Sequence, residues 1–367
     1  KRLIKMNKSI SFFKEITKNF RKEKVKLILV THLLIDRPEF IESLSKIIDV
    51  ALIIPNPKTI NQQILNKLGR YNVVNTTREK LGQEDYSIQL IKKYVGKEKF
   101  VISDIGGYFA ETLYRLKEHF GEQLLGVIED TENGFKRYSK IKKIPCPIYS
   151  VARSPLKLTE DTLVAYSTVY SAERILRDYN EVLLGKKSLV IGFGKIGSRI
   201  AKDLSRKQSI VKVWDADPIK LVYALSEGFE ICTKNNYLKD VDLIFAVTGN
   251  KCLDEKKLNR LKGKVYVFSI TSSDDEFNFN NFSSFNKKLL NSDLVLTNRI
   301  SEIHLINRGN AVNFLHNAVV GDFIRLVQAE ILLDIIELIK GRDSKDFLEL
   351  SEEKRKYISK MWLKYFS

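Results

Sequence analysis

Three glycines near the middle of the chain have the spacing of a phosphate-binding turn. Gly192, Gly194 and Gly197 form a Gly-x-Gly-x-x-Gly motif directly after an apolar run and directly before a helical pattern. The first glycine allows a tight turn, the second lets a pyrophosphate approach the backbone, and the third lets helix and strand pack closely. The helix opens with Lys195 and Ile196, at the positive end of the helix dipole. This segment therefore predicts a binding site for a dinucleotide.

An acidic residue after the next apolar run supports the same interpretation. Residues 210–214 have the pattern of a strand that ends at Asp215, and Asp215 follows Gly194 by 21 residues. A carboxylate at this place binds the ribose hydroxyls of the adenosine half and disfavours the additional phosphate of NADP. We therefore predict NAD as the cofactor.

Apolar runs that alternate with helical patterns must position these residues. Pro55 and Pro57 are expected to end the second strand of the first half. This alternation predicts a parallel sheet covered by helices on both faces. The strands expected in the first half are residues 25–30, 50–54, 71–74, 100–103, 124–128 and 148–151.

A second alternation surrounds the glycine motif, with long helices expected at 160–180 and 318–339 and an irregular segment at 277–291. We therefore predict an α/β protein with two doubly wound parallel-sheet domains, the second a Rossmann NAD-binding domain inserted in a discontinuous substrate domain. The strands expected here are residues 188–192, 210–214, 243–247 and 264–270. The expected domains are 1–166 (substrate domain, first part), 167–315 (NAD-binding domain) and 316–367 (C-terminal helices returning to the substrate domain).

The bulk composition narrows the class of protein. The chain has 367 residues, of which 44% are hydrophobic and 29% charged, and this is typical of a soluble globular protein with two domains. Its net charge of +17 is spread along the chain without a basic cluster interleaved with aromatics, so we expect no nucleic-acid partner. The most apolar stretch is interrupted by acidic residues, so we expect no membrane partner.

The cysteines and acidic residues exclude other kinds of site. Cys146, Cys232 and Cys252 lie far apart, which argues against a disulfide framework and a zinc site. Such cysteines fit a reducing compartment, and we expect a cytoplasmic location. The acidic run 274–276 is expected to be a solvated loop, and we predict no metal.

Several segments, in the same order along the chain, resemble the S-adenosyl-L-homocysteine hydrolase family. Residues 127–134 (Val-Ile-Glu-Asp-Thr-Glu-Asn-Gly) are similar to its Glu-Glu-Thr-Thr-Thr-Gly loop. Residues 154–161 resemble a family segment with a lysine and an aspartate four residues apart. The resemblance extends from about residue 25 to the helix after 318. Further similar segments are 192–197 and 215–219 of the cofactor domain, the Thr-Gly turn 248–249, and 306–311, which is similar to Val-Asn-Leu-Gly-Cys-Ala.

This resemblance implies an enzyme that keeps NAD tightly bound and uses it to oxidise the ribose 3′-hydroxyl of a nucleoside transiently. The resulting ketone acidifies the C4′ proton, the 5′ thiol leaves, water adds, and the oxidation is reversed. A small nucleoside-type substrate and a homo-oligomer, dimer or tetramer, are implied as well. Two alternatives remain: an NAD-dependent dehydrogenase acting on another nucleoside or sugar hydroxyl, and a catalytically silent NAD-binding regulatory homologue.

The resemblance also implies roles for particular residues. His32 handles protons near the 5′ position, Lys157 helps to deprotonate the 3′-hydroxyl, Asp161 orients ribose and nicotinamide, and Asp130 binds the ribose. From the residues alone, His32 is equally compatible with a structural histidine, and Lys157 and Asp161 with a surface ion pair. The implied cofactor residues, beside the glycine turn, are Thr131, Asn133, Thr248, Gly249 and Asn307. The implied substrate-binding residues are Asp36, Asp104, Glu129 and His316.

Three positions depart from the family pattern. Ser272 stands where the family has a histidine near the substrate. Asp104 aligns with the first of two adjacent aspartates, so that Ile105 takes the place of the catalytic one. His316 reaches the place of the family's C-terminal histidine only after a shift. These departures concern proton transfer and the choice of substrate, not the glycine turn or Asp215.

Overall fold

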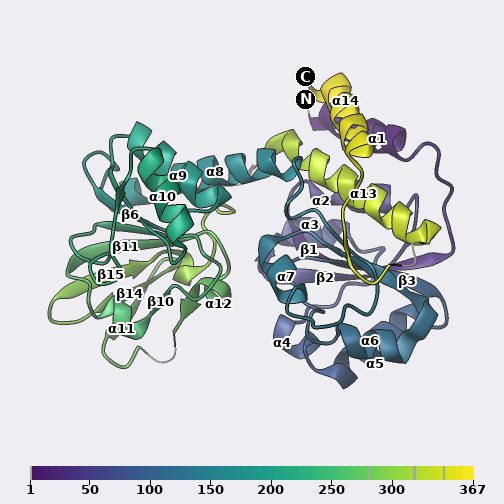
Figure 1. Cartoon of the computed structure of the whole chain (residues 1–367), viewed down its shortest axis with the longest axis horizontal. Coiled ribbons are helices and arrows are strands. Elements are labelled where there is room, and N and C mark those ends of the chain that lie inside the picture. The colour runs from purple at the N-terminus through teal and green to yellow at the C-terminus, as the bar shows by residue number, and fades with distance from the viewer. Residues whose placement is uncertain (1, 280–281, 317–319, 342–343) are drawn as a thin grey trace. The chain divides into compact units, whose positions relative to one another are not determined.

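The computed structural model describes residues 2–279, 282–316, 320–341 and 344–367. They form two compact units, the first joining Lys1–Leu158 to Gly321–Ser367 and the second comprising Thr159–Val320. Each unit has its own sheet and its own hydrophobic core (Figure 1). The boundaries expected for the functional domains, after residues 166 and 315, stay predictions.

The sheet of the first unit has six parallel strands in the order β16-β5-β4-β3-β1-β2. Five of them follow a common doubly wound order, 2-1-3-4-5, in which ligands bind beyond the carboxyl ends of the strands. The inner strands are apolar throughout because helices cover both faces. The strands are β1 (Val25–Leu33), β2 (Asp49–Ile60), β3 (Lys99–Asp104), β4 (Leu124–Glu129), β5 (Ile148–Ser150) and β16 (Phe347–Leu348).

Strand β2 differs from the expectation, because it continues through Pro55 and Pro57 instead of ending there. It is the outermost strand of the sheet, where a residue without an N–H group does not interrupt a central ladder. The expected strand at 71–74 is absent as well. Among the described residues, this segment forms one bridge, between Val73 and Ile53.

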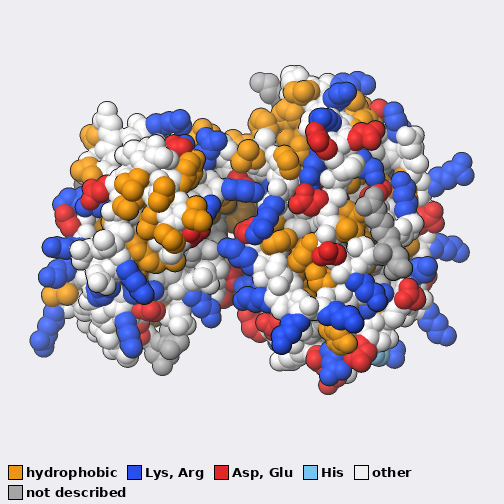
Figure 2. All heavy atoms as spheres, viewed as in Figure 1, with side chains coloured by type: hydrophobic (Ala, Val, Ile, Leu, Met, Phe, Trp, Pro, Cys, Tyr) orange, Lys and Arg blue, Asp and Glu red, His pale blue; other side chains and the backbone are white. Residues whose placement is uncertain are grey.

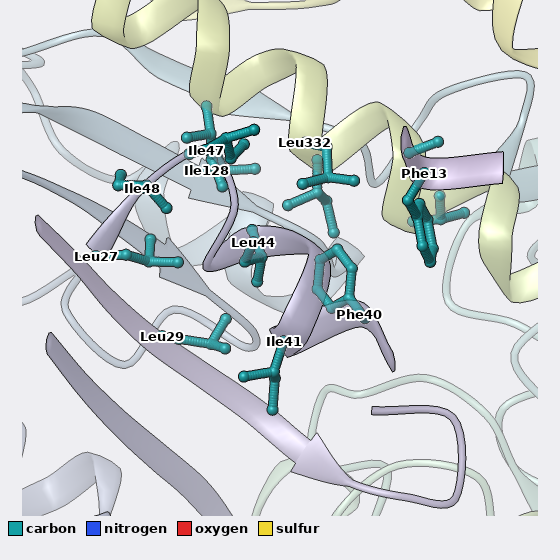
Figure 3. Packing of buried hydrophobic residues seen from close by; sticks show 14 of the residues in the cluster. Phe13, Leu27, Leu29, Phe40, Ile41, Leu44, Ile47, Ile48, Ile128 and Leu332 are labelled. Atoms are coloured by element: carbon teal, nitrogen blue, oxygen red, sulfur yellow. The ribbon is translucent and has the colours of Figure 1, made fainter. Parts of the chain in front are cut away.

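Helices cover both faces of the first sheet. One face packs against α1, α2, α13 and α14, and the other against α5 and α6. In Figure 3 Phe40 and Leu44 of α2 lie between Leu332 of α13 and strand β1, and Phe13 of α1 lies beside Phe40. The helices are α1 (Arg2–Ile16), α2 (Arg37–Leu44), α3 (Gln62–Lys67), α4 (Arg78–Leu81), α5 (Glu84–Val95), α6 (Leu113–Phe120), α7 (Glu132–Tyr138), α13 (Ile324–Lys340) and α14 (Glu352–Phe366).

The sheet of the second unit has the order β13-β14-β15-β11-β9-β6-β7-β8. Six neighbouring strands of this sheet are parallel, in the order β8-β7-β6-β9-β11-β15. This is the dinucleotide-binding order 3-2-1-4-5-6. The predicted fold class is therefore confirmed. The strands are β6 (Lys187–Ile191), β7 (Ile210–Trp214), β8 (Glu230–Ile231), β9 (Leu243–Ala246), β11 (Gly263–Ser269), β13 (Asn286–Leu290), β14 (Asp293–Thr297) and β15 (Ser301–Leu305), with a separate pair β10 (Leu253–Asp254) and β12 (Phe277–Asn278).

An antiparallel hairpin extends this sheet, and it corrects the expectation of an irregular segment at 277–291. Strand β13 lies within that segment and pairs with β14, with Asn286 opposite Thr297. All its residues are exposed, so its sequence lacks the buried apolar positions by which a strand is recognised. The strand forms because the turn at 291–292 brings it beside β14.

The central sheet of this unit is covered on one face by α8, α9 and α10. Its other face packs against α11 and the segment around Tyr237. The helices are α8 (Lys157–Asp178), which begins at the end of the first unit, α9 (Lys195–Arg206), α10 (Pro218–Ser226), α11 (Glu255–Leu258) and α12 (Ser273–Glu276).

The surface carries charge without a single basic patch on the face in view. Figure 2 shows Lys and Arg side chains dispersed over that face, with Asp and Glu side chains between them. Within the described ranges, no helix has both the length and the apolar character that crossing a bilayer requires.

Candidate functional site

The glycine turn between β6 and α9 has the geometry that a pyrophosphate needs. Gly192 has φ +100°, and a Cβ atom there would lie 2.8 Å from the carbonyl oxygen of Val247. A Cβ on Gly197 would lie 1.9 Å from the carbonyl oxygen of Gly192, so helix and strand are in direct contact. A Cβ on Gly194, the N-cap of α9, would meet no atom within 4 Å. The turn is therefore closed toward the protein and open where a phosphate approaches.

Asp215 follows β7 and lies beside this turn. Its carboxylate accepts hydrogen bonds from Phe193 N at 2.7 Å and Asp217 N at 2.9 Å. The carboxylate is thus held next to the glycine backbone, where the adenosine ribose of a dinucleotide binds. At the start of α9, Lys195 Nζ lies 3.9 Å from Asp161 Oδ2, which brings a predicted catalytic residue to the same helix N-terminus.

A buried glutamate that we did not predict holds the turn after β9. The carboxylate of Glu276 accepts hydrogen bonds from Thr248 N at 2.8 Å, Gly249 N at 2.7 Å and the Thr271 hydroxyl at 2.7 Å. Glu276 is fully buried, so the expectation of a solvated acidic loop is wrong for this residue. Its partners lie up to 28 residues away in sequence, and no local pattern identifies it.

Asn307 lies in a strained turn directly after β15. It has φ 51° and the next residue, Arg308, has φ 53°, a left-handed conformation that non-glycine residues seldom adopt. The N–H of Asn307 donates to Asp293 Oδ1 at 2.7 Å, and its side-chain amide donates to the carbonyl of Ala311 at 3.2 Å. The predicted role of Asn307 toward the cofactor stays a prediction.

Comparison with known families agrees with this geometry. Residues 166–319 match the family model described as S-adenosyl-L-homocysteine hydrolase, NAD binding domain. The second unit is an NAD-binding Rossmann domain, and NAD is its cofactor. The open backbone at the glycine turn fits the pyrophosphate of NAD, and the carboxylate of Asp215 fits its adenosine ribose.

Some solved structures match this chain at low sequence identity. A phosphoglycerate oxidoreductase from Vibrio cholerae o395 is 12% identical, and the match covers 86% of this chain and 99% of that protein, with a TM-score of 0.48. Dipicolinate synthase, A chain, from Bacillus subtilis is 10% identical over 88% of this chain and 99% of its own (TM-score 0.43). A glyoxylate reductase from Paecilomyes thermophila is 11% identical over 70% of this chain and 75% of its own (TM-score 0.39).

Three predicted catalytic residues come together in the first unit, at the carboxyl end of its sheet. Lys157 Nζ lies 2.6 Å from Asp130 Oδ1, and the two side chains are 10% and 13% exposed. His32, near the end of β1, lies close enough for both charges to influence its ionisation. An amino group, a carboxylate and an imidazole thus share one edge of a parallel sheet, where ligands bind in this class of fold.

The environment shifts the pKa values of this cluster. Burial lowers the pKa of His32 to about 4, and the nearby Arg37 acts in the same direction. Burial alone would raise the pKa of Asp130, but the charge of Lys157 and its hydrogen bond lower it below the usual value. At neutral pH the imidazole is therefore uncharged and Asp130 is ionised.

Glu129 and Asp104, predicted to bind substrate, are fully buried and bonded within the unit. Glu129 accepts hydrogen bonds from Gly106 N and Gly107 N at 3.0 Å and from the Thr131 hydroxyl at 2.7 Å. Asp104 Oδ2 accepts from the Tyr138 hydroxyl at 2.6 Å and from the amide N of residue 109 at 3.1 Å. In this conformation the two carboxylates shape the loops beside Asp130 and expose no surface to a ligand.

The remaining predicted residues lie in different surroundings. Asp36 Oδ2 accepts from Gln328 at 2.6 Å and pairs with Arg37 at 3.1 Å. Asn133 lies in the first turn of α7, which Thr131 caps by accepting from Gly134 N. His316 belongs to the second unit, where its Nδ1 lies 2.9 Å from Ser171 Oγ. Within the residues the structure describes, no group of three His, Cys, Asp or Glu side chains is placed to hold a metal.

Proposed function

We propose that the protein is an S-adenosylhomocysteine hydrolase-like enzyme acting on S-adenosylhomocysteine or a related nucleoside. The observation that carries the proposal is the buried pair of Lys157 and Asp130 beside a neutral His32, in a chain with an NAD-binding domain. Bound NAD supplies the reversible oxidation of a substrate hydroxyl. The residues of the chain supply orientation and proton transfer.

In this proposal four side chains have distinct tasks, which their contacts support. Lys157 Nζ donates to Asp130 at 2.6 Å. In this account the lysine first releases one proton to solvent, and its neutral amine then takes the proton from the ribose 3′-hydroxyl and later returns it. Asp130 orients Lys157 and stays ionised because of the lysine charge. His32 is uncharged at neutral pH, so it can accept a proton near the 5′ position. Asp161, whose carboxylate lies 3.9 Å from Lys195 Nζ at the start of α9, orients the ribose.

The experiment is to incubate the NAD-loaded protein with S-adenosylhomocysteine and follow free thiol, adenosine and NADH absorbance. Release of thiol and adenosine without lasting NADH supports the proposal. The Lys157→Met variant should abolish this release, whereas Lys136→Met, on the exposed side of α7, should leave it unchanged. Equal thiol release by Lys157→Met and the wild-type protein would contradict the assigned role.

A dehydrogenase reaction is the second candidate, and Ser272 is the residue that favours it. It stands where the resembling family has a histidine, and as the N-cap of α12 its side chain accepts no capping hydrogen bond. A site with fewer proton carriers fits net oxidation of a hydroxyl. In the same assay this reaction gives NADH in proportion to substrate and no thiol. A catalytically silent homologue gives neither signal and still binds NAD.

The setting of the enzyme is part of the proposal. The three cysteines are free thiols, which supports a reducing, cytoplasmic compartment. From the family resemblance we propose a homo-oligomer, and a division into substrate and NAD-binding domains at residues 166 and 315.

A further inference from the structure

His32 lies opposite an irregular part of β2. The register of the β1–β2 pair shifts between Thr31 and Leu33, whose partners on β2 are Pro55 and Ile60. The intervening residues of β2 therefore lie opposite the single residue His32. Bulges of this kind redirect a side chain and are frequent beside functional sites.

The bulge brings a threonine hydroxyl to the imidazole. Thr59 Oγ1 lies 2.6 Å from His32 Nδ1. The same hydroxyl is placed to donate to the carbonyl oxygen of Asn56 at 3.4 Å, and Asn56 Oδ1 in turn accepts from Lys58 N at 3.0 Å. When the hydroxyl proton is directed to a backbone carbonyl, the oxygen keeps its lone pairs for a donor.

We infer that Thr59 is a positioning residue, which accepts a hydrogen bond from Nδ1–H and so holds His32 in the tautomer with its lone pair on Nε2. The consequence rests on the proposed function, because Nε2 is then the atom that accepts a proton from the substrate. The opposite tautomer would offer a donor at that atom. Thr59 itself touches neither the substrate nor the reacting atoms in this account.

Burial and the surrounding charges keep the imidazole neutral, so its tautomer determines which nitrogen can accept a proton. Burial is the largest effect and disfavours a positive imidazole. Arg37 and Lys157 act in the same direction, while Asp36 and Asp130 oppose it. The ring is therefore neutral near pH 7, and which nitrogen carries the single proton depends on the hydrogen bond made by the other.

The test is nitrogen NMR of the full-length protein labelled with ¹⁵N-histidine, recorded without substrate near pH 7. The chain has four histidines, and a His32→Gln variant identifies the signals of His32. We expect its two nitrogens to show a protonated Nδ1 and an unprotonated Nε2. Signals of His119, His304 and His316 serve as internal controls for an intact fold.

Two variants separate positioning from mere packing. Thr59→Val keeps the branched shape and removes the hydroxyl, so the His32 signals should change toward the Nε2-protonated form. Thr59→Ser keeps the hydroxyl and should restore the wild-type pattern. An Nε2-protonated His32 in the wild-type protein, or an unchanged pattern in Thr59→Val, would overturn the inference. If Thr59→Val does not fold, the wild-type spectrum decides alone. Failure of the hydrolase assay would count against the proposed function and leave this result unaffected.

Discussion

The third glycine of the phosphate-binding turn packs directly on the first. A Cβ atom at Gly197 would lie 1.9 Å from the Gly192 carbonyl oxygen, which is backbone and cannot turn away. We expect Gly197→Ala to displace α9 from β6 and to destabilise the protein by about 1–3 kcal/mol, the usual effect of overpacking. Urea unfolding measures this loss, and calorimetric titration should show that NAD binding is lost with it.

Gly194→Ala is the matched control for that variant. The added methyl group would meet no protein atom within 4 Å, so the unfolding midpoint should stay unchanged. The methyl group lies where the pyrophosphate must approach the backbone, so NAD affinity should still fall. Wild-type affinity in Gly194→Ala would show that the cofactor does not bind over this turn.

We expect substitution of the fully buried Glu276 to weaken the cofactor site. Its carboxylate accepts from two backbone N–H groups, of Thr248 and Gly249. In Glu276→Gln, an amide group replaces one acceptor oxygen and leaves buried donors unsatisfied, at a cost of about 1–3 kcal/mol. Urea unfolding and NAD titration should both detect the loss. Asp274→Asn, at the exposed neighbouring position, should change neither, and equal behaviour of the two variants would refute the assigned role.

We expect ionisation of His32 to lower the free energy of unfolding as the pH falls. Its pKa is lowered to about 4 in the folded protein, so between its usual value of 6.5 and 4 the unfolded chain binds a proton that the folded chain does not. The free energy of unfolding therefore falls by about 3 kcal/mol as the pH decreases from 6.5 toward 4, and above pH 6.5 this loss is absent. His32→Gln removes the group, so the difference between the two unfolding free energies should change over this range. A constant difference from pH 7 to pH 4.5 would contradict the prediction.

Asp334 of α13 predicts the opposite pH dependence. It is 1% exposed, and neither of its carboxylate oxygens has a hydrogen-bond partner. Burial, together with the charge of Glu330, raises the pKa of Asp334 well above the usual range. The protonated carboxyl therefore contributes to the free energy of unfolding at low pH, and this contribution is lost as the pH rises. Asp334→Asn cannot ionise and should be more stable than the wild-type protein at pH 8 by about 1–3 kcal/mol. The advantage should shrink at pH 4 in urea unfolding, and an advantage independent of pH would be evidence against a buried ionisable carboxyl.

Local patterns predicted the cofactor domain well because its determinants are local. The glycines of the turn and Asp215 lie within one strand–helix–strand unit, and the parallel pairing of β6 with β7 follows from that alternation. The pairing of Lys157 with Asp130 was harder to foresee, since the spacing of Lys157 and Asp161 also suits a surface ion pair.

The missed features depend on contacts between distant segments. Glu276 lies in an acidic run that resembles a solvated loop, and the backbone donors of its carboxylate lie in the distant turn at Thr248 and Gly249. Thr59 follows two prolines that normally end a strand, and it reaches His32 because β2 is an outermost strand and can bulge. In both cases burial and register, which no short window contains, decide the role of the residue.

Transient oxidation of a nucleoside ribose is the central claim, and exchange of the C4′ proton tests it most directly. The NAD-loaded protein is incubated with adenosine in D₂O, and the recovered adenosine is analysed by mass spectrometry and proton NMR. The account predicts uptake of one deuterium at C4′, because a 3′-ketone acidifies that position, and no uptake with Lys157→Met. Adenosine recovered without deuterium, from protein shown to hold NAD and adenosine, would contradict it.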